Sequence, residues 1–328
     1  MRSTRPVMSE RREAQRPRIG VIGAGVAGLS AARRLADAGL EVTVFEKSRG
    51  LGGRMACRRR DGLQFDHGAQ FVDADAPALQ DLLAAARSQG LAADWTEAAR
   101  EAQRYVVGVP GMNAMCRPLA DGLDIRFDTE IRTLRRAGSG WAIGSAGGDV
   151  HVDRVILTIP APQLPRLEME LDPETRDALY GVRFAPALAL MVAFEERPDW
   201  PAIQRTPPAP FALILRDSSK PGRPGDAECW VAHADEAWSR RNVELDRPEI
   251  GAALLSELEA AMAPLPPSRA VMGHRWRYSQ ATQPLGRAFI ASGCGTLLFG
   301  GDWALGDRVE HAAESGRAMA AAILAETE

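Results

Sequence analysis

The chain has 328 residues, of which 45% are hydrophobic and 25% are charged, and its formal net charge is −3. At roughly 150 residues per domain, this length suggests about two domains, and the composition is that of a globular protein rather than a disordered or fibrous one. The nearly balanced charge argues against a nucleic-acid binder, and no apolar run reaches the roughly 18 residues that a transmembrane helix needs.

The N-terminal residues and the cysteines both indicate in which cellular compartment the protein is expected. Residues 1–17 are rich in arginine and lack the apolar segment of a signal peptide. They are predicted to be a disordered tail or to precede the true start at Met8, with a basic nucleic-acid arm as the alternative. Because no CxxC spacing occurs, we expect no zinc site and reduced thiols in a cytoplasmic protein. The four cysteines are Cys57, Cys116, Cys229 and Cys294.

The first ordered segment has a strand–helix–strand pattern. Ile19–Ile22 is a short apolar run that predicts a buried strand, and Ala27–Ala38 predicts a helix that ends at Gly39. Val42–Phe45 predicts a second buried strand. The unit occupies about 30 residues, as expected for a right-handed βαβ crossover.

The next elements continue this first domain. The spacing of leucines predicts a helix over Ala76–Ser88, and prolines at 160 and 162 close a buried strand and mark the exit from the domain. The predicted strands are Ile125–Phe127, Glu130–Leu134, Trp141–Ile143 and Val155–Ile159.

Between about residues 161 and 270 the character changes to strands separated by Pro/Gly-rich loops, with one helix at Glu249–Met262. This pattern predicts an antiparallel sheet with helices. The predicted strands are Leu188–Phe194, Phe211–Leu215 and Cys229–His233. A strand at Leu297–Gly300 and a helix at Val309–Ala325 then return to the first pattern, which predicts a discontinuous first domain.

The glycines after the first strand indicate a dinucleotide site. Gly23, Ala24, Gly25, Val26, Ala27 and Gly28 form a GxGxxG motif between a strand and a helix. The glycines permit a tight turn, close approach of a pyrophosphate and close packing of helix on strand. Glu46 lies 18 positions after Gly28, at the end of the second strand, where its carboxylate can accept ribose hydroxyls and repel a 2′-phosphate.

Two further motifs favour a flavin over a nicotinamide cofactor. Lys47 begins a basic loop that ends in Gly52, Gly53 and Arg54, whose guanidinium can reach phosphate oxygens. Near the C-terminus, Gly300-Gly301-Asp302-Trp303 precedes a helix. Together with GxGxxG, these motifs resemble the flavin amine-oxidase superfamily, in which the aspartate binds a ribityl hydroxyl and the helix N-terminus faces the flavin.

This resemblance implies an α/β fold of the flavin amine-oxidase and glutathione-reductase type. A Rossmann-like FAD-binding domain would comprise residues 18–75, 106–160 and 271–328, and an α+β substrate domain built on an antiparallel sheet would comprise 76–105 and 161–270. The FAD is expected to be non-covalent. Beyond the residues named above, the resemblance places on the cofactor Gly68, Ala69, Gln70, Ile131, Gly301, Asp302, Val309 and Glu310.

A finer resemblance is to the bacterial group of renalase-like flavoproteins. The matching stretches include EKSRGLGGRMACRR at 46–59, FDHGAQFV at 65–72, CWVAHADEAWSRRN at 229–242 and HRWRYSQ at 274–280. The segment between Thr96 and Arg104 is shorter than in those relatives, which weakens the inference about substrate there.

The resemblance implies an oxidase of off-pathway dihydro-NAD(P) isomers, the 2- and 6-dihydro forms. Hydride would pass to the flavin to give NAD(P)+, and O2 would be reduced to H2O2. Because loss of hydride aromatises the pyridine ring, we expect no acid or base catalyst and no metal, only positioning of the two rings. The expected partners are therefore a dinucleotide-like small molecule and O2, and neither nucleic acid nor a membrane.

The substrate residues are a conditional prediction. Gln70 and Phe71 are expected near the flavin ring, and Arg216 and Lys220 could meet substrate phosphates. Aromatic side chains could wall the pocket or belong to the core; these are His274, Tyr278 and Trp303. His67 is equally consistent with a place beside the flavin and with a turn, whereas His233 is expected to be structural.

Two other functions stay open. Many amine oxidases of this superfamily place a lysine and a water at the flavin, and this chain has only Lys47 and Lys220. Lys47 neighbours the ribose-binding Glu46, so Lys220 is the one candidate and an amine oxidase is the less favoured alternative. A non-catalytic flavin-binding protein is the third hypothesis.

Overall fold

The computed structural model describes residues 16–98, 104–225 and 227–326. Its first large sheet has the strand order β19-β20-β12-β1-β2-β8, and all neighbours are parallel except β19. The strands are β1 (Arg18–Ile22), β2 (Glu41–Phe45), β8 (Asp124–Arg126), β12 (Arg154–Leu157), β19 (Phe289–Ala291) and β20 (Leu297–Gly300). Both ends of the chain therefore contribute to one sheet.

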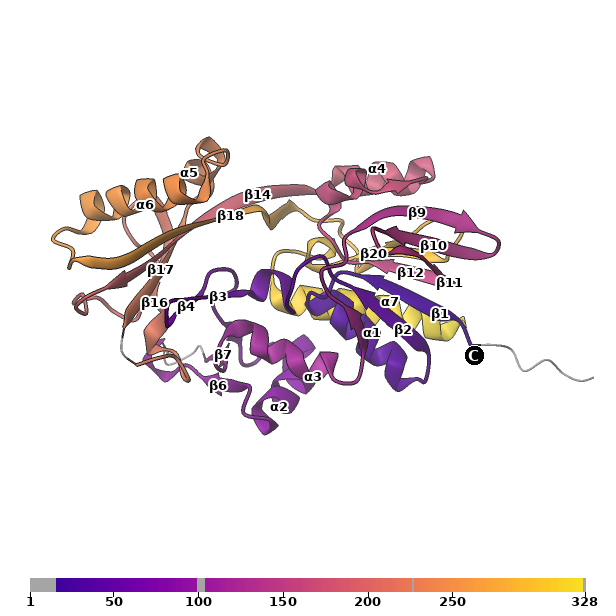
Figure 1. The fold of residues 1–328 in the computed structure, drawn as a ribbon, viewed down its shortest axis with the longest axis horizontal. Helices are drawn as coiled ribbons and strands as arrows, with labels where there is room; N and C mark the ends of the chain where they lie inside the picture. The colour runs from indigo at the N-terminus through magenta and orange to yellow at the C-terminus, as the bar shows by residue number, and fades with distance from the viewer. Residues whose placement is uncertain (1–15, 99–103, 226, 327–328) are drawn as a thin grey trace, which may run out of the picture.

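The two faces of this sheet are covered differently (Figure 1). Helices α1 (Val26–Asp37) and α7 (Val309–Ala325) cover one face, and a smaller sheet with the order β11-β10-β9-β13 covers the other. A Cβ atom at Gly316 of α7 would lie 2.1 Å from the carbonyl oxygen of Ala27, so the two helices pack closely. The smaller sheet and its neighbouring helix are β9 (Ile131–Ala137), β10 (Gly140–Ser145), β11 (Gly148–Val152), β13 (Glu168–Met169) and α4 (Pro173–Gly181).

The second large sheet is antiparallel, with the order β15-β16-β17-β14-β18. Helices α5 (Glu236–Arg241) and α6 (Arg247–Met262) cover its outer face, and a capping box between Asp246 and Glu249 begins α6. The long strands β14 and β18 run side by side toward the first sheet (Figure 1). The strands are β14 (Arg183–Phe194), β15 (Ile203–Gln204), β16 (Phe211–Arg216), β17 (Glu228–Ala234) and β18 (Ser268–Gln283).

Short elements join the two units. A hairpin of β3 (Cys57–Arg60) and β4 (Leu63–Asp66) leads into a small sheet with the order β5-β7-β6. These elements lie beside the inner face of the antiparallel sheet in Figure 1. The remaining elements are β5 (Val72–Asp73), β6 (Ala92–Asp94), β7 (Tyr105–Gly108), α2 (Gln80–Ser88) and α3 (Arg117–Ala120).

The expected α/β fold with a nucleotide-binding unit and an antiparallel sheet is confirmed. The sequence missed β18, whose 16 residues pair along β14, so the antiparallel sheet extends past the expected domain boundary at residue 270. The expected helix at Ala76–Ser88 begins only at Gln80, after a 3-10 turn. Moreover, α2 packs on α3 and its preceding turn packs on α7, so residues 77–88 contact the first unit rather than the antiparallel sheet.

Candidate functional site

The loop between β1 and α1 has the geometry of a pyrophosphate cradle. Gly23 has a φ of +110°, which favours glycine, and a Cβ atom at Gly28 would lie 1.9 Å from the Gly23 carbonyl oxygen. At Gly25 a Cβ atom would meet nothing within 4 Å, and no side chain caps the helix there. The first N–H groups of α1 therefore face open space beside a positive helix end, which suits an anion.

Glu46 lies at the end of β2, as the sequence predicts, and is buried. Its carboxylate oxygens accept hydrogen bonds from the backbone N–H groups of Ala24 and Ser48, each at 2.8 Å. These two bonds hold the carboxylate beside the glycine loop, and each oxygen keeps a lone pair for a ribose hydroxyl. Lys47 instead points to Gln163, whose Oε1 accepts from its Nζ at 3.0 Å.

The second glycine motif lies against the first. Gly52 and Gly53 both have positive φ values, and a Cβ atom at Gly53 would lie 3.6 Å from the Cα of Gly25. Arg54 follows at once and donates to Asp302 at 2.5 Å and to the Ser279 carbonyl at 2.9 Å. Arg54, which the sequence assigns to the phosphate oxygens, and Asp302, which the resemblance assigns to a ribityl hydroxyl, therefore form one ion pair.

The C-terminal motif positions Asp302 at the end of β20. Gly301 has a φ of +152°, and its N–H donates to the Ser315 hydroxyl of α7 at 2.9 Å. Val309 and Glu310 form the first turn of α7, and Ile131 begins β9. Trp303, which the sequence offers as a pocket wall, is fully buried and donates to the Ile159 carbonyl at 3.1 Å. Of the two alternatives expected for this residue, the structure supports the core one, because the indole packs in the core next to the small sheet.

The loop after β4 is pressed against Arg54. The Ala69 N–H donates to the Arg54 carbonyl at 2.8 Å, and a Cβ atom at Gly68 would lie 1.9 Å from the same oxygen. Only glycine therefore fits at position 68. The contact holds the loop that carries Asp66, His67 and Gln70 against the backbone of Arg54, whose side chain pairs with Asp302.

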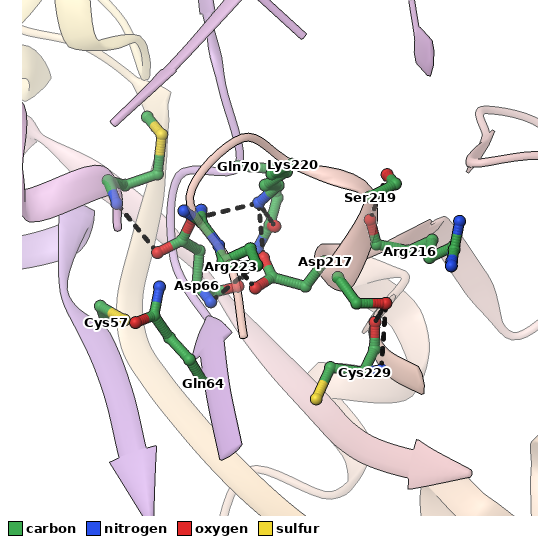
Figure 2. A network of polar contacts seen from close by, with 12 residues as sticks. Cys57, Gln64, Asp66, Gln70, Arg216, Asp217, Ser219, Lys220, Arg223 and Cys229 are labelled. Carbon is green, nitrogen blue, oxygen red and sulfur yellow. Dashed lines mark hydrogen bonds and ion pairs between the residues drawn. The ribbon is translucent and has the colours of Figure 1, made fainter. Parts of the chain in front are cut away.

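A buried network of two carboxylates and two cations ties this loop to the antiparallel sheet (Figure 2). Lys220 Nζ lies 2.7 Å from Asp217 Oδ1 and 3.2 Å from Asp66 Oδ2, and Arg223 pairs with both carboxylates. All four side chains are at most 1% exposed. Burial raises the pKa of Asp66 and the charge of Lys220 opposes this shift. We name these four residues the buried charge quartet.

Lys220 also orients Gln70. Its Nζ donates to Gln70 Oε1 at 2.9 Å, and Gln70 Nε2 lies 3.0 Å from His233 Nε2. The Gln70 amide therefore donates to His233, whose pKa is lowered to about 4 by burial and by the charge of Lys220. The expected phosphate role of Lys220 and Arg216 does not fit these contacts. Lys220 is paired within the quartet. Arg216 forms a bidentate ion pair with Glu228, in which Nη2 and Nε donate to the two carboxylate oxygens at 2.6 and 2.8 Å.

Three aromatic rings gather where this loop meets β18. The ring centroids of His67 and His274 are 4.3 Å apart. The centroid of Trp276 lies 5.3 Å from that of His67, in a stacked arrangement, and 4.4 Å from that of His274, in a tilted one. We name these three residues the ring cage. Both imidazoles are buried, and neither Nδ1 atom has a hydrogen-bond partner. Burial lowers the pKa of His67 to about 4 and that of His274 to about 2, so both are neutral at pH 7.

The floor beside the ring cage consists of small residues. Ala187 of β14 pairs with Trp276, and Ala189 pairs with His274 on one side and His233 on the other. Directly paired residues share a face of the sheet, so the two alanines lie on the same face as Trp276, His274 and His233. Sequence reasoning missed Trp276, Asp217 and Arg223; the alternation of small and large residues along β14 was the signal available for this face.

The two remaining expected substrate residues, Phe71 and Tyr278, contact aromatic rings outside the ring cage. Phe71 packs on Tyr105 at 4.5 Å and on Trp95 at 6.3 Å between ring centroids. Tyr278 lies edge-on to Phe184 at 6.1 Å, farther along β18. In the part of the chain that the structure describes, no three His, Cys, Asp or Glu side chains gather as a metal site would require, and no helix is long and apolar enough to cross a membrane.

Comparison with known families identifies this arrangement. Residues 21–86 match an NAD(P)-binding Rossmann-like domain, and residues 88–324 match the flavin containing amine oxidoreductase family. The chain belongs to the flavin containing amine oxidoreductase family. Its cofactor is therefore FAD, and the anion cradle, the anchored Glu46 and the buried Asp302 are chemically suited to the phosphates, ribose and ribityl chain of FAD.

Individual proteins resemble this chain either over a short segment at high identity or over nearly its whole length at low identity. The chain is 54% identical over 55 residues to a 4,4'-diapophytoene desaturase of Staphylococcus aureus, a match that spans 17% of this chain and 11% of the desaturase. Cyclohexylamine oxidase from Brevibacterium oxydans has a TM-score of 0.74 at 12% identity, covering 95% of this chain and 99% of the oxidase. Putrescine oxidase has a TM-score of 0.71 at 16% identity, covering 94% and 99%. The two oxidases establish the common fold.

Proposed function

We propose that this amine oxidoreductase family member is an FAD-dependent oxidase of dihydro-NAD(P) isomers, the 2- and 6-dihydro forms. The products would be NAD(P)+ and, after reaction with O2, H2O2. Bound FAD supplies the hydride acceptor, and the chain needs to hold the substrate ring beside it.

The electrostatic surroundings of the ring cage carry this proposal. Burial is the largest cause of the lowered pKa values of His67 and His274, and the neighbouring histidines and the arginines Arg58 and Arg247 lower them further. A region of positive potential disfavours an ammonium substrate and favours a neutral ring attached to an anionic tail. The flanking carboxylates Asp66 and Asp217 are neutralised within the buried charge quartet.

The roles of the side chains follow from their contacts. The indole of Trp276 offers a flat apolar face, and the Nδ1 atoms of His67 and His274 offer neutral polar atoms without partners. Such groups can position a flat ring that bears a carboxamide. Because oxidation aromatises the dihydropyridine ring, no residue has to remove a proton, and correct placement supplies the main rate enhancement.

An amine oxidase is the second candidate, since residues 88–324 match the amine oxidoreductase family. Lys220 is the lysine that this reading would use. Its ammonium, however, is held by two carboxylates and the Gln70 amide, which leaves it little freedom to activate a water.

An anaerobic titration separates the two candidates. We expect the NADH isomers formed by borohydride reduction of NAD+ to bleach the visible absorbance of the bound flavin, with NAD+ as product and one H2O2 per turnover once air is admitted. Putrescine and cyclohexylamine serve as the amine panel, and ordinary NADH is the isomer control. Bleaching by an amine but by no dihydronicotinamide isomer would refute the proposal.

A further inference from the structure

Arg205 follows β15, contacts two aromatic rings and has two buried nitrogen atoms without hydrogen-bond partners. Its guanidinium carbon lies 4.7 Å from the ring centroid of Tyr105 and 5.2 Å from that of Phe71. Its Nε and Nη2 atoms are buried and have no hydrogen-bond partner. Arg216 and Arg223 differ, because carboxylates and carbonyl groups take up their N–H groups.

The contact with the rings does not satisfy the guanidinium. An aromatic ring interacts with the flat face of the group, whereas the N–H bonds point outward in its plane. A buried donor without an acceptor costs about 1–3 kcal/mol, and more when it is charged. Folded proteins rarely leave such donors empty, so the acceptor is expected to come from a ligand.

The position of Arg205 links it to the ring cage. It contacts Phe71, which directly follows Gln70, and consecutive Cα atoms lie about 3.8 Å apart. Gln70 in turn contacts His233, which shares a sheet face with His274 of the cage. His233 and His274 lie on strands that flank β14, two strand spacings or about 10 Å apart. A ligand with a ring in the cage therefore reaches Arg205 only if its anion lies on the order of 10 Å or more from that ring, as the pyrophosphate of an extended dinucleotide can.

We propose that Arg205 binds the pyrophosphate of a dinucleotide substrate. This inference rests on the proposed function and assigns to Arg205 the phosphate-binding role that was expected of Arg216 and Lys220. A guanidinium held over two neighbouring rings presents its N–H edge in a fixed direction, which matches the paired oxygens of a phosphate. The site would distinguish dinucleotides from simple amines and from dihydronicotinamides that lack phosphate.

The first test compares two substrates of the same ring chemistry. For Arg205→Gln, we expect KM for isomeric NADH to rise about 10- to 100-fold, as loss of charged hydrogen bonds predicts, with kcat nearly unchanged. The isomers of dihydro-N-methylnicotinamide lack phosphate and should be oxidised equally well by wild type and variant. Arg205→Lys keeps the charge but loses the fork, so we expect an intermediate KM. Equal loss with both substrates, or no loss with either, would overturn the assignment.

The second test does not depend on turnover. Calorimetric titration of the flavin-loaded protein with inorganic pyrophosphate should show binding that Arg205→Gln weakens at least about 10-fold. Arg197, an exposed arginine, provides the control Arg197→Gln, which should bind as wild type does. If no dihydronicotinamide reduces the flavin but pyrophosphate binding still depends on Arg205, the proposed function fails and the anion site stands. Pyrophosphate binding that is unchanged in Arg205→Gln overturns the site, and the far-UV circular dichroism and flavin content of each variant verify that it is folded.

Discussion

At the scale of single residues, the buried histidines connect structure with pH. His67, His233 and His274 are all neutral because burial lowers their pKa values. A neutral imidazole is both a donor and an acceptor, whereas an imidazolium only donates. The ring cage can therefore accept a hydrogen bond from a ligand amide only while His67 and His274 stay unprotonated.

The lowered pKa values predict a loss of stability in mild acid. The unfolded chain takes up protons below the ordinary histidine pKa of about 6.5, whereas the folded chain does not until about pH 4 at His67 and His233. Between these values, each such histidine should lower the free energy of unfolding by about 1.4 kcal/mol per pH unit as the pH falls. Urea unfolding between pH 7 and pH 5 measures this slope. In His274→Asn one histidine is removed, so the slope should be smaller; an equal slope would contradict the assignment.

Which residues belong to the site was predictable only where the signal is local. The Gly23–Gly28 loop was recognised because its glycines lie close together in the sequence, and the backbone requires glycine at Gly23 and Gly28. The partnership of Asp66 with Lys220 joins residues 154 positions apart and left no mark on either segment. Arg216 and Arg205 look alike in the sequence, and only their neighbours, Glu228 in one case and two rings in the other, distinguish them.

At the scale of elements, the loops after β2, β4 and β20 converge on one place. The pair of Arg54 and Asp302 is the junction, and Ser279 of β18 joins it through its carbonyl. Residues in loops at the carboxyl ends of parallel strands are held by the rigid sheet behind them, which suits them to bind a cofactor.

This convergence predicts that either residue of the pair affects retention of FAD. Asp302→Ala and Arg54→Ala each remove one partner of a partly buried ion pair and leave the other charge unpaired at the site. We expect a lower ratio of flavin to protein after gel filtration, measured by absorbance and compared with the exposed-pair control Arg277→Ala. If both variants keep the wild-type ratio, the assignment of these residues to the cofactor is wrong.

Element prediction from sequence succeeded where periodicity was strong. The predicted helix Val309–Ala325 has the observed bounds of α7, and the predicted strand Leu297–Gly300 those of β20. The strand β18 was missed because its residues mix small, basic and aromatic side chains without alternation. Its conformation is set by pairing along β14, so tertiary contacts rather than local preference decide it.

At the scale of the whole molecule, the buried charge quartet binds the hairpin of β3 and β4 to the antiparallel sheet. Asp66 is the last residue of β4, whereas Asp217, Lys220 and Arg223 follow β16 of the antiparallel sheet (Figure 2). Because two negative and two positive charges balance, the group is tolerated in the interior. It fixes the distance between the loop that carries Gln70 and the sheet that carries His233.

Removing one cation from the quartet should therefore be costly. Lys220→Met keeps much of the side-chain volume but leaves Asp66 and Asp217 with a single counter-charge, and we expect the free energy of unfolding to fall by about 3–5 kcal/mol. Arg277→Met breaks the exposed pair with Glu244 and should change it by less than about 1 kcal/mol. Denaturant unfolding of both variants measures the difference. Equal, small effects would indicate that the quartet does not stabilise the fold.

The packing of α7 on α1 has a consequence for biosynthesis. The parallel sheet lacks β20 until residue 300 has been translated. The face of α1 that packs against Gly316 of α7 remains exposed to solvent until residue 316 has also been translated. During synthesis at about 5–20 residues per second, the nascent N-terminal half thus waits many seconds with apolar surface exposed. Capture of the vitamin-derived cofactor is accordingly expected only after β20 and α7 have been translated, and the growing polypeptide is expected to bind chaperones until then.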